Sequence, residues 1–386
     1  MYETAKMYEN DLIQFAQDLV KIKSYTGQEG DIAKFIERKM NELDYDEVYI
    51  DDLGNVIGVI GSGPTKILFD SHIDTVQVND AEAWTYGPFD GTIVDGRLYG
   101  RGSVDMKSAV AATVYAGHVI NKMGYAEGKT VYISTSVMEE DYDGEPVSYL
   151  CEKSNIEPDF AIICEPSSMK LAMGHKGRAL IKVSVKGVSA HGSAPEKGDN
   201  AIYKMSEIIK RVEMLGQLMM SKPGEKGSLA LTKIESEAVS INAIPPVCNI
   251  YLDRRLILGE DYDFISKEME TLLKGIEASW EVYDVTGQSW TGEEITLHSF
   301  MSAWEISEEH RLSKACISAY DEVFECKPTQ IKWDFCTNAV ATCKAGIPTI
   351  GIGPGNDKLA HMVDENCSVN EIKDAFKFYV NLVNKL

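Results

Sequence analysis

Acidic residues and histidines stand at the ends of several apolar runs in this chain. The segment KILFDSHIDTV, residues 66–76, has the pattern of a buried strand that leads into Asp70, His72 and Asp74. A buried carboxylate is costly unless it is paired or bound to a metal ion. The same arrangement, an acid or a histidine just beyond an apolar run or at a loop-to-helix junction, recurs at Asp105, Glu139, Glu140, Glu165 and His361.

These positions predict one cluster rather than several unrelated features. In a wound α/β sheet, ligands bind at the edge where the carboxyl ends of the strands lie. Histidines and several carboxylates gathered there would repel one another without cations, so divalent metal ions are the natural compensation. Taken alone, a His-x-Asp is usually an ordinary hydrogen-bonded pair and a Glu-Glu is usually a solvated loop. Their joint occurrence in one framework favours the metal site.

The elements that must position these residues form two kinds of pattern. Up to about residue 175, helical patterns alternate with short apolar runs, which indicates a parallel or mixed sheet covered by helices. The next portion has the order β-α-β-β-α-β, the ferredoxin-like arrangement. After residue 293 the α/β pattern resumes. We therefore predict a catalytic α/β domain built from residues 1–176 and 293–386, with an α+β domain of residues 177–292 inserted in it.

Composition limits the classes of function. The net charge of −22, from 38 basic and 60 acidic residues, argues against nucleic-acid binding, because no basic surplus exists to neutralise phosphates. No uncharged apolar run approaches the roughly 18 residues that a membrane span needs. The N-terminal residues lack a basic segment followed by an apolar one, so no secretory signal is expected. Eight scattered cysteines without a C-x-x-C pair are typical of free core thiols, which predicts a cytoplasmic protein.

Several motifs together resemble the zinc-dependent metallopeptidase family 20, which includes acetylornithine deacetylase, succinyl-diaminopimelate desuccinylase and carboxypeptidases. They are SHIDTV, GRGSVDMKSA, EED, CEPS, SAHGSAP, NAIP followed by LDRR, and GPG followed by AHMVDE. Within the family, EEDYDGE, HGSAPEKGDNAIYKM, SWTG and KWDFCTN look most like the YgeY-type subgroup. The resemblance implies a mixed-sheet, zinc-exopeptidase-like catalytic domain that carries a lid and dimerisation domain.

The resemblance also implies two bound divalent metal ions, zinc in the first place, with cobalt or manganese as alternatives. His72 and Glu165 would bind one ion, Glu140 and His361 would bind the other, and Asp105 would bridge both.

Two acids next to these ligands would have other roles. Asp74 lies two residues from His72 in an extended segment, so it projects to the same side and can orient the imidazole. By resemblance, Glu139 would be the general base. Adjacent residues of an extended chain point in opposite directions, so Glu140 can bind a metal ion while Glu139 faces the reacting water.

Three residues of the inserted domain are further candidates. By resemblance, His191 reaches the active site of a partner subunit and helps to stabilise the oxyanion, which requires a homodimer formed through the lid. Without the resemblance, His191 is a surface-loop histidine. Arg255 would bind a substrate carboxylate through its bidentate fork, or it is a surface arginine paired with an acid. Asn242 resembles a position near the substrate carbonyl, although its neighbours also fit a plain turn.

The expected function is hydrolysis of the amide bond of an N-acyl amino acid or small peptide with a free carboxylate. Metal ions would activate a water molecule, and Glu139 would accept its proton. A dipeptidase or carboxypeptidase on the same site is the nearest alternative. A catalytically silent binding homologue is a third interpretation, against which stands the presence of every expected ligand and of the base.

Overall fold

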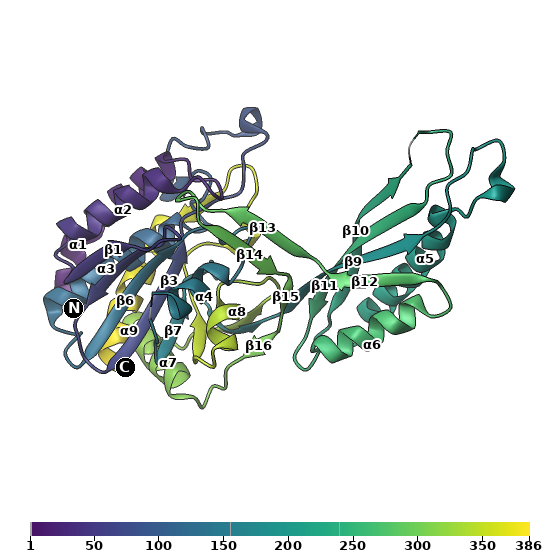
Figure 1. The fold of residues 1–386 in the computed structure, drawn as a ribbon. Coiled ribbons are helices and arrows are strands. Elements are labelled where there is room, and N and C mark those ends of the chain that lie inside the picture. The colour runs from purple at the N-terminus through teal and green to yellow at the C-terminus, as the bar shows by residue number, and fades with distance from the viewer. Residues whose placement is uncertain (1, 155, 239) are drawn as a thin grey trace.

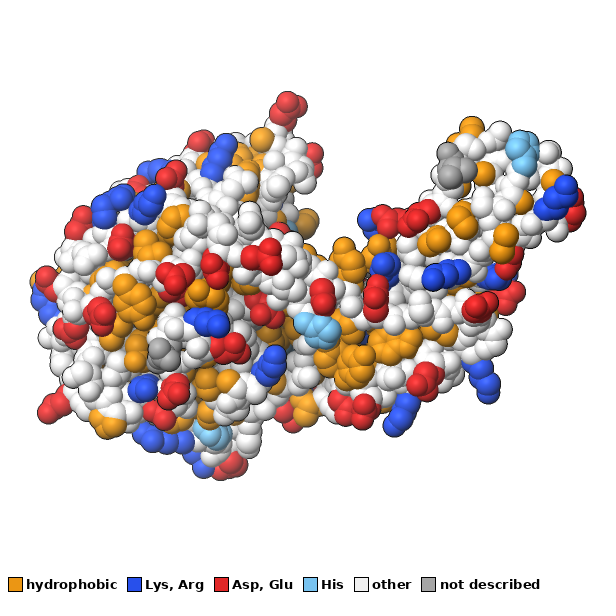
Figure 2. All heavy atoms as spheres, viewed as in Figure 1, with side chains coloured by type: hydrophobic (Ala, Val, Ile, Leu, Met, Phe, Trp, Pro, Cys, Tyr) orange, Lys and Arg blue, Asp and Glu red, His pale blue; other side chains and the backbone are white. Residues whose placement is uncertain are grey.

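The computed structural model describes residues 2–154, 156–238 and 240–386, and it has two lobes joined by a narrow waist (Figure 1). The larger lobe contains both chain termini. The smaller lobe, called the lid below, consists of residues 177–238 and 240–282. The space-filling view shows a broad notch between the two lobes (Figure 2). Among the described residues, no helix is long and apolar enough to cross a membrane.

A nine-stranded mixed sheet forms the centre of the large lobe. Strands β3, β6, β7 and β18 run parallel to their neighbours in this group, so their carboxyl ends share one edge of the sheet. The sheet follows the order β1-β2-β6-β3-β7-β18-β8-β16, with β17 also paired to β8. The strands are β1 (Glu47–Ile50), β2 (Val56–Ile60), β3 (Thr65–His72), β6 (Lys129–Ser136), β7 (Phe160–Ile163), β8 (Leu171–His175), β16 (Trp304–Glu305), β17 (Gln330–Trp333) and β18 (Thr349–Gly351).

Helices cover both faces of this sheet because successive strand residues point to opposite faces. Ile67 and Phe69 pack in the main core with one set of helices, whereas Leu68 packs in a smaller cluster with α4 and α8. The helices of the main core are α1 (Tyr2–Lys21), α2 (Gly30–Glu42), α3 (Lys107–Met123), α7 (Arg311–Phe324) and α9 (Val369–Lys385). Those of the opposite face are α4 (Glu145–Glu152) and α8 (Ala339–Lys344). The predicted mixed α/β sheet covered by helices is therefore confirmed.

Among the described residues, the structure also contains a small antiparallel sheet and three short 3₁₀ helices. The sheet consists of β4 (Thr92–Val94), β5 (Arg97–Tyr99) and β19 (Asn366–Ser368). The 3₁₀ helices are η1 (Ala81–Ala83), η2 (Pro195–Lys197) and η3 (Asp357–Leu359).

The lid has the predicted element order β-α-β-β-α-β, and its strands are antiparallel in the order β10-β11-β9-β12. Alternate residues of β9, such as Ile181 and Val183, face α5 and α6 in a separate apolar core, and the residues between them form the open face of the sheet. The elements are β9 (Gly177–Lys186), α5 (Ala201–Ser221), β10 (Ser228–Glu237), β11 (Val247–Leu256), α6 (Tyr262–Leu273) and β12 (Ala278–Val282). A short strand, β15 (Phe300–Met301), pairs with the start of β9.

After the lid, a hairpin of β13 (Asp284–Gln288) and β14 (Glu294–His298) returns to the large lobe. Ile295 and Leu297 belong to the main core. At the hairpin tip, Trp290 packs against Gly54, and its Nε1 donates to the Gly54 carbonyl oxygen at 3.3 Å. Gly54 has a φ of 108° and no room for a side chain beneath the indole ring, so both its backbone and its contact require glycine. The predicted boundary at residue 292 falls in the turn of this hairpin.

Candidate active site

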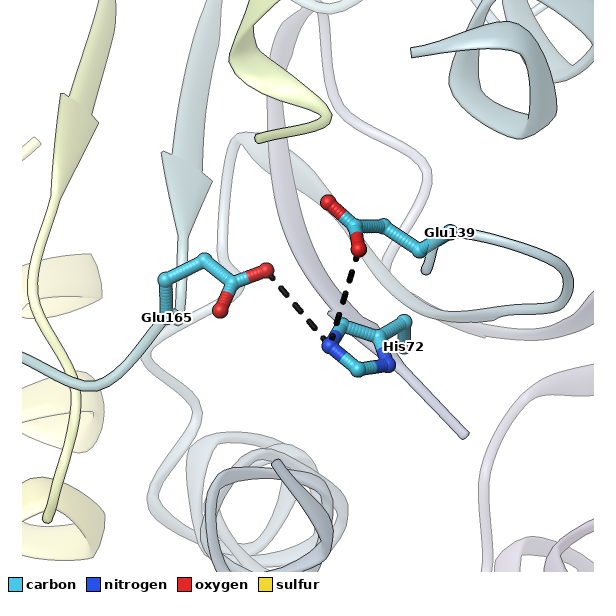
Figure 3. A group of neighbouring side chains, drawn as sticks. All are labelled: His72, Glu139 and Glu165. Atoms are coloured by element: carbon cyan, nitrogen blue, oxygen red, sulfur yellow. Dashed lines mark ion pairs between the residues drawn. The ribbon is translucent and has the colours of Figure 1, made fainter. Parts of the chain in front are cut away.

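The acids and histidines singled out in the sequence converge at the carboxyl edge of the main sheet. His72 ends β3, Glu139 and Glu140 follow β6, Glu165 follows β7, and Asp105 precedes α3. His361 joins them from the loop after η3. Figure 3 shows the side chains of His72, Glu139 and Glu165 pointing toward one another from three separate segments.

His72 lies at the buried end of the cluster. Its Nε2 is 2.9 Å from Asp105 Oδ1, 3.6 Å from Glu165 Oε1 and 3.9 Å from Glu139 Oε2. His361 lies at the more open end, where its Nε2 is 3.1 Å from Asp105 Oδ2 and 3.0 Å from Glu140 Oε2. The two carboxylate oxygens of Asp105 therefore face two different histidines.

The donor atoms have the composition and spacing of a metal centre. Imidazole nitrogens and carboxylate oxygens suit zinc and similar ions, and neighbouring ligands of a tetrahedral zinc with bonds of about 2.0–2.1 Å lie roughly 3.3 Å apart. Among the residues that the structure describes, two groups are compact enough to hold one ion each, and His72 belongs to both. They are His72 with Glu139 and Glu165, and His72 with Asp105 and Glu140. The residues thus fit a metal ion, with Glu139 close enough to take part in binding.

The cluster contains more acidic side chains than histidines, and this excess of negative charge shifts the pKa values of its members. Burial lowers the pKa of His72, but the negative charge of Glu165 and the hydrogen bond to Asp105 outweigh it and raise that pKa well above its usual value. Hydrogen bonds to Asp105 and Glu140 raise the pKa of His361 to about 10. Without a bound metal ion, the raised pKa values favour the protonated, positively charged form of both imidazole rings.

The pKa values of the three glutamates are raised as well, which favours their neutral forms. Burial, followed by the charge of Glu165, raises the pKa of Glu139 well above its usual value, and burial does the same for Glu165. Burial and the charge of Asp105 raise the pKa of Glu140 to about 7. Such perturbed groups in one cavity are typical of functional sites, and a divalent cation would stabilise their ionised forms.

Asp74 supports the cluster mainly through the backbone. Its Oδ1 accepts a hydrogen bond from the Glu139 amide at 3.0 Å and its Oδ2 from the Glu140 amide at 3.1 Å. Thr26 Oγ1 donates to the same carboxylate at 2.9 Å. His72 Nδ1 lies 3.0 Å from the Asp74 carbonyl oxygen and 3.4 Å from its Oδ1. Asp74 therefore contacts His72, as predicted, and it also holds the two glutamates in place.

Two further buried acids, Glu29 and Glu365, were missed in the sequence. Glu29 Oε1 accepts hydrogen bonds from the amides of Gly27 at 2.9 Å and Met138 at 3.1 Å. Met138 has a φ of 59°, a left-handed conformation that is costly for this residue type and is found at functional sites. Glu29 precedes a helix without any local motif, so its contact with residue 138 had no signal in the sequence.

Glu365 plays the same part for the backbone of Asp105. Its Oε1 accepts from the amides of Val104 at 2.8 Å and Asp105 at 3.1 Å, and its Oε2 pairs with Arg101. It follows His361 closely in the motif AHMVDE, which was the available signal. Asp70, by contrast, binds the side chain of Asn338 at 2.9 Å and lies outside the metal-sized groups.

The cluster lines one side of a cavity of about 310 Å³ between the lobes. Arg255, at the end of β11, lines the same cavity, so the structure brings this predicted residue to the cluster. Its Nε and Nη2 donate to the carboxylate of Asp253 at 2.8 and 3.1 Å. The lining residues are Asp105, Glu139, Glu140, Asp143, Glu165, Pro166, Arg178, Arg255, Phe335, Cys336, Asp357, Ala360 and His361.

His191 and Asn242 lie elsewhere. Both are exposed, in the loops that follow β9 and β10, and His191 forms an isolated bridge with Ala243. These loops lie at the end of the lid away from the large lobe (Figure 1). His191 Nδ1 is 2.7 Å from Ser193 Oγ, and Asn242 accepts a hydrogen bond from Ser240. Neither residue lines the cavity of its own chain.

Comparison with known proteins agrees with this architecture. A profile of the peptidase family M20/M25/M40 matches residues 68–385. The chain belongs to this family. It is 36% identical over 367 residues to the uncharacterized protein YgeY of Escherichia coli strain K12, covering 94% of this chain and 91% of YgeY. It is 30% identical over 336 residues to an acetylornithine deacetylase of Buchnera aphidicola, covering 85% of this chain and 83% of that enzyme.

Solved structures of the M20 family share the fold. Aminopeptidase PepT from Bacillus cereus superposes with a TM-score of 0.75 at 20% identity, covering 98% of both chains. The predicted resemblance to metallopeptidase family 20, including the YgeY-type subgroup, is confirmed, as is the catalytic α/β fold with its inserted domain. As a member of this family, the protein is a metal-dependent hydrolase.

Proposed function

We propose that the protein hydrolyses the amide bond of an N-acyl amino acid or small peptide that carries a free carboxylate. The arrangement of Asp105 supports this proposal most directly, because its Oδ1 faces His72 at 2.9 Å and its Oδ2 faces His361 at 3.1 Å. A carboxylate that contacts a different histidine with each oxygen suits a bridge between two cations.

Five side chains would hold two divalent ions, which we propose to be zinc, with cobalt or manganese as alternatives. His72 and Glu165 would serve one ion, Glu140 and His361 the other, and Asp105 both. When bound, the ions would supply a water molecule of lowered pKa and a Lewis acid for the amide carbonyl.

Glu139 is proposed as the general base. It would take the proton from the attacking water and pass it to the leaving amine. Its carboxylate lies 3.9 Å from His72 and lines the cavity, and Asp74 holds its backbone amide at 3.0 Å. In this scheme the amides of residues 138–140, held by Glu29 and Asp74, keep the base at a fixed distance from the metal ligands.

The lid would bind the substrate. We assign the carboxylate of the substrate to Arg255, which lines the cavity. His191 and Asn242 would act on the carbonyl in the cavity of a second subunit, in a homodimer formed through the lid. Two observations support a dimer there: β10 is an edge strand of the lid sheet, and α5 beside it exposes Tyr203, Met214 and Leu218.

The alternative functions differ from the proposed one either in the substrate that is bound or in whether any substrate is hydrolysed. A dipeptidase or carboxypeptidase would use the same metal site with a free amine or a peptide in place of the acyl group. A silent binding homologue would keep the cluster without turnover. We favour a hydrolase, because every proposed ligand and the proposed base lie in one cluster, most of which lines the cavity. Its eight free cysteines fit the cytoplasmic location that we propose.

Metal content is the first test of the proposed function. We expect about two transition-metal ions per chain by plasma mass spectrometry, and a sharp fall in the Asp105→Ala variant, since both sites use this carboxylate. Asp80→Ala, at an exposed aspartate, is the matched control and should keep its metal. The wild type should then hydrolyse members of a panel of N-acyl amino acids and dipeptides. If the wild-type protein binds no added zinc, the proposed metal-dependent mechanism is wrong and the interpretation as a catalytically silent binding homologue is favoured.

A further inference from the structure

The active-site cavity contains a second arginine, Arg178, to which sequence analysis gave no role. Arg178 lies near the start of β9, directly opposite Arg255 of β11 in the antiparallel register. Residues that oppose each other in this way have Cα atoms about 4.5–5.5 Å apart and side chains on the same face of the sheet. Both line the cavity with the metal cluster. The open face of the lid sheet therefore brings two guanidinium groups side by side to the proposed site of hydrolysis.

The hydrogen bonding of Arg178 is incomplete. Its Nη2 donates to Asp143 Oδ1 at 3.1 Å, but its buried Nε has no partner among the described residues. The side chain is only 18% exposed. A buried N–H group without an acceptor costs free energy, and native proteins leave few of them unless a ligand or water binds there.

Arg254, the residue before Arg255, shows what a fully bonded arginine looks like in the same sheet. It points to the helical face and donates to both oxygens of Glu268 at 3.0 and 3.2 Å and to Glu260 at 2.9 Å. Its side chain is 1% exposed. Its Nη1 also donates to the carbonyl oxygen of Arg255, so each nitrogen of Arg254 has an acceptor, whereas the Nε of Arg178 has none among the described residues.

Each cavity arginine is held by one aspartate. Asp143 contacts Arg178 through one nitrogen, and Asp253 contacts Arg255 through Nε and Nη2. These acids relieve the repulsion between the two guanidinium groups and fix their positions. No described residue accepts from Nη1 of either arginine or from Nε of Arg178, so donors for planar anions remain on both.

We propose that Arg178 binds a second carboxylate of the substrate, next to the one on Arg255, so that the preferred leaving group is an acidic amino acid, aspartate or glutamate. This assignment rests on the proposed function. A guanidinium fork matches the geometry of a carboxylate, and two neighbouring forks match the α- and side-chain carboxylates of one residue. Arg178 is then the residue that sets specificity for the leaving amino acid.

The test compares N-acylglutamate with N-acylglutamine, which have nearly the same shape and differ by one negative charge. The acyl group is the one that the metal-loaded wild type hydrolyses fastest in the panel above. We expect the wild type to favour the glutamate substrate in kcat/KM by about 10- to 100-fold, the range of one charge-assisted hydrogen-bonded contact. Arg178→Met should bring the ratio close to one, through KM rather than kcat. Arg255→Met should weaken both substrates and keep a preference.

Two further variants keep the outcome interpretable. Arg178→Met leaves Asp143 buried without its cation, so the double variant Asp143→Asn with Arg178→Met tests the same loss with both charges removed. Lys182→Met, on the same face of β9 but outside the cavity lining, is the matched control and should keep the wild-type ratio. Melting temperature and metal content are measured for each protein.

Three results would overturn the assignment. Equal rates on the two substrates in the wild type would contradict it, while the proposed function stands. An unchanged glutamate preference in both Arg178 variants would show that the ion pair with Asp143 only joins the two lobes. Turnover of no N-acyl amino acid and no dipeptide by metal-loaded wild type would overturn the proposed function and this assignment together.

Discussion

The edge of the main sheet and the tip of the lid were both expected to supply catalytic residues, yet they are built in opposite ways. At the sheet edge, His72 and Glu139 are buried and the side chain of Asp105 is only 13% exposed. The backbone of Asp105 and Glu139 is held by buried carboxylates. At the lid tip, His191 and Asn242 stand on exposed loops away from the cavity of their own chain. A cluster of ligand side chains from one chain is fixed by the fold of that chain, whereas the role proposed for the tip residues requires a second subunit.

Loss of the base should give the largest effect. In Glu139→Gln we expect kcat to fall by at least about 10²–10⁴-fold, the usual contribution of a general base, while the metal content stays near that of the wild type. Glu127→Gln, at an exposed glutamate, should leave kcat unchanged. Steady-state rates and plasma mass spectrometry on the same preparations make the measurement. Near-wild-type kcat in Glu139→Gln would assign the base to another residue.

Mixing two inactive variants tests whether the lid tip acts across subunits. His191→Ala alone should lose about 10²–10³-fold in kcat if it contributes a donor to the oxyanion. When His191→Ala and Glu139→Gln proteins are unfolded and refolded together, half of the dimers should carry one intact site. Activity should then recover to roughly a quarter of the wild-type value, as expected for random pairing in a two-fold dimer. Activity no higher than the mean of the separate variants would place His191 outside the neighbouring site.

Substitutions of the two neighbouring arginines of β11 should have different effects, Arg254→Met on stability and Arg255→Met on substrate binding. Arg254→Met removes one side of a buried ion-pair network with Glu260 and Glu268, and we expect a loss of about 3–5 kcal/mol in the free energy of unfolding. Arg255→Met should instead raise KM by about 10- to 100-fold with a much smaller change in stability. Urea unfolding and steady-state kinetics of both variants provide the comparison. A large loss of stability in Arg255→Met would reclassify it as a structural residue.

The effect of Glu29 should be seen in the pH dependence of the free energy of unfolding. Burial and the charge of Asp74 raise the pKa of Glu29 to about 8 from its usual value of 4.5. Between these values the folded protein keeps a proton that the unfolded chain has released, so the contribution of Glu29 to stability falls as the pH rises. Glu29→Gln cannot titrate there. The stability of wild type relative to Glu29→Gln should therefore decrease from about pH 5 to about pH 8 in urea unfolding. A constant or increasing difference would contradict this.

The cluster at the carboxyl edge of the main sheet could be predicted from the sequence because the positions of its residues obey one rule. His72, Glu139 and Glu165 each come at or just after the end of a strand, and strands that run parallel bring such positions together. The supports of the cluster could not be predicted in this way. Glu29 reaches the Met138 amide only because two loops distant in sequence meet, with Met138 in a left-handed conformation.

The lid illustrates a different limit. Its β-α-β-β-α-β order follows from periodicity, and the structure confirms it. Arg178, however, occupies an ordinary half-exposed position in the alternation of β9, and only the pairing register with Arg255 places it in the cavity. The hairpin after the lid was also hidden, because its alternating residues are equally compatible with the lid sheet and with the large lobe.

The pairing of β15 with the start of β9 has a consequence for how the chain folds. Phe300 pairs with Ala179, and Met301 with Arg178, so the stretch that holds the lid and the β13–β14 hairpin begins and ends at adjacent positions. The large lobe must join N-terminal and C-terminal halves that are separated in sequence by the whole lid, and closing so long a loop in an unfolded chain costs entropy and time. A lid that forms first acts as a short tether, because its folding brings the two halves together before they search for each other.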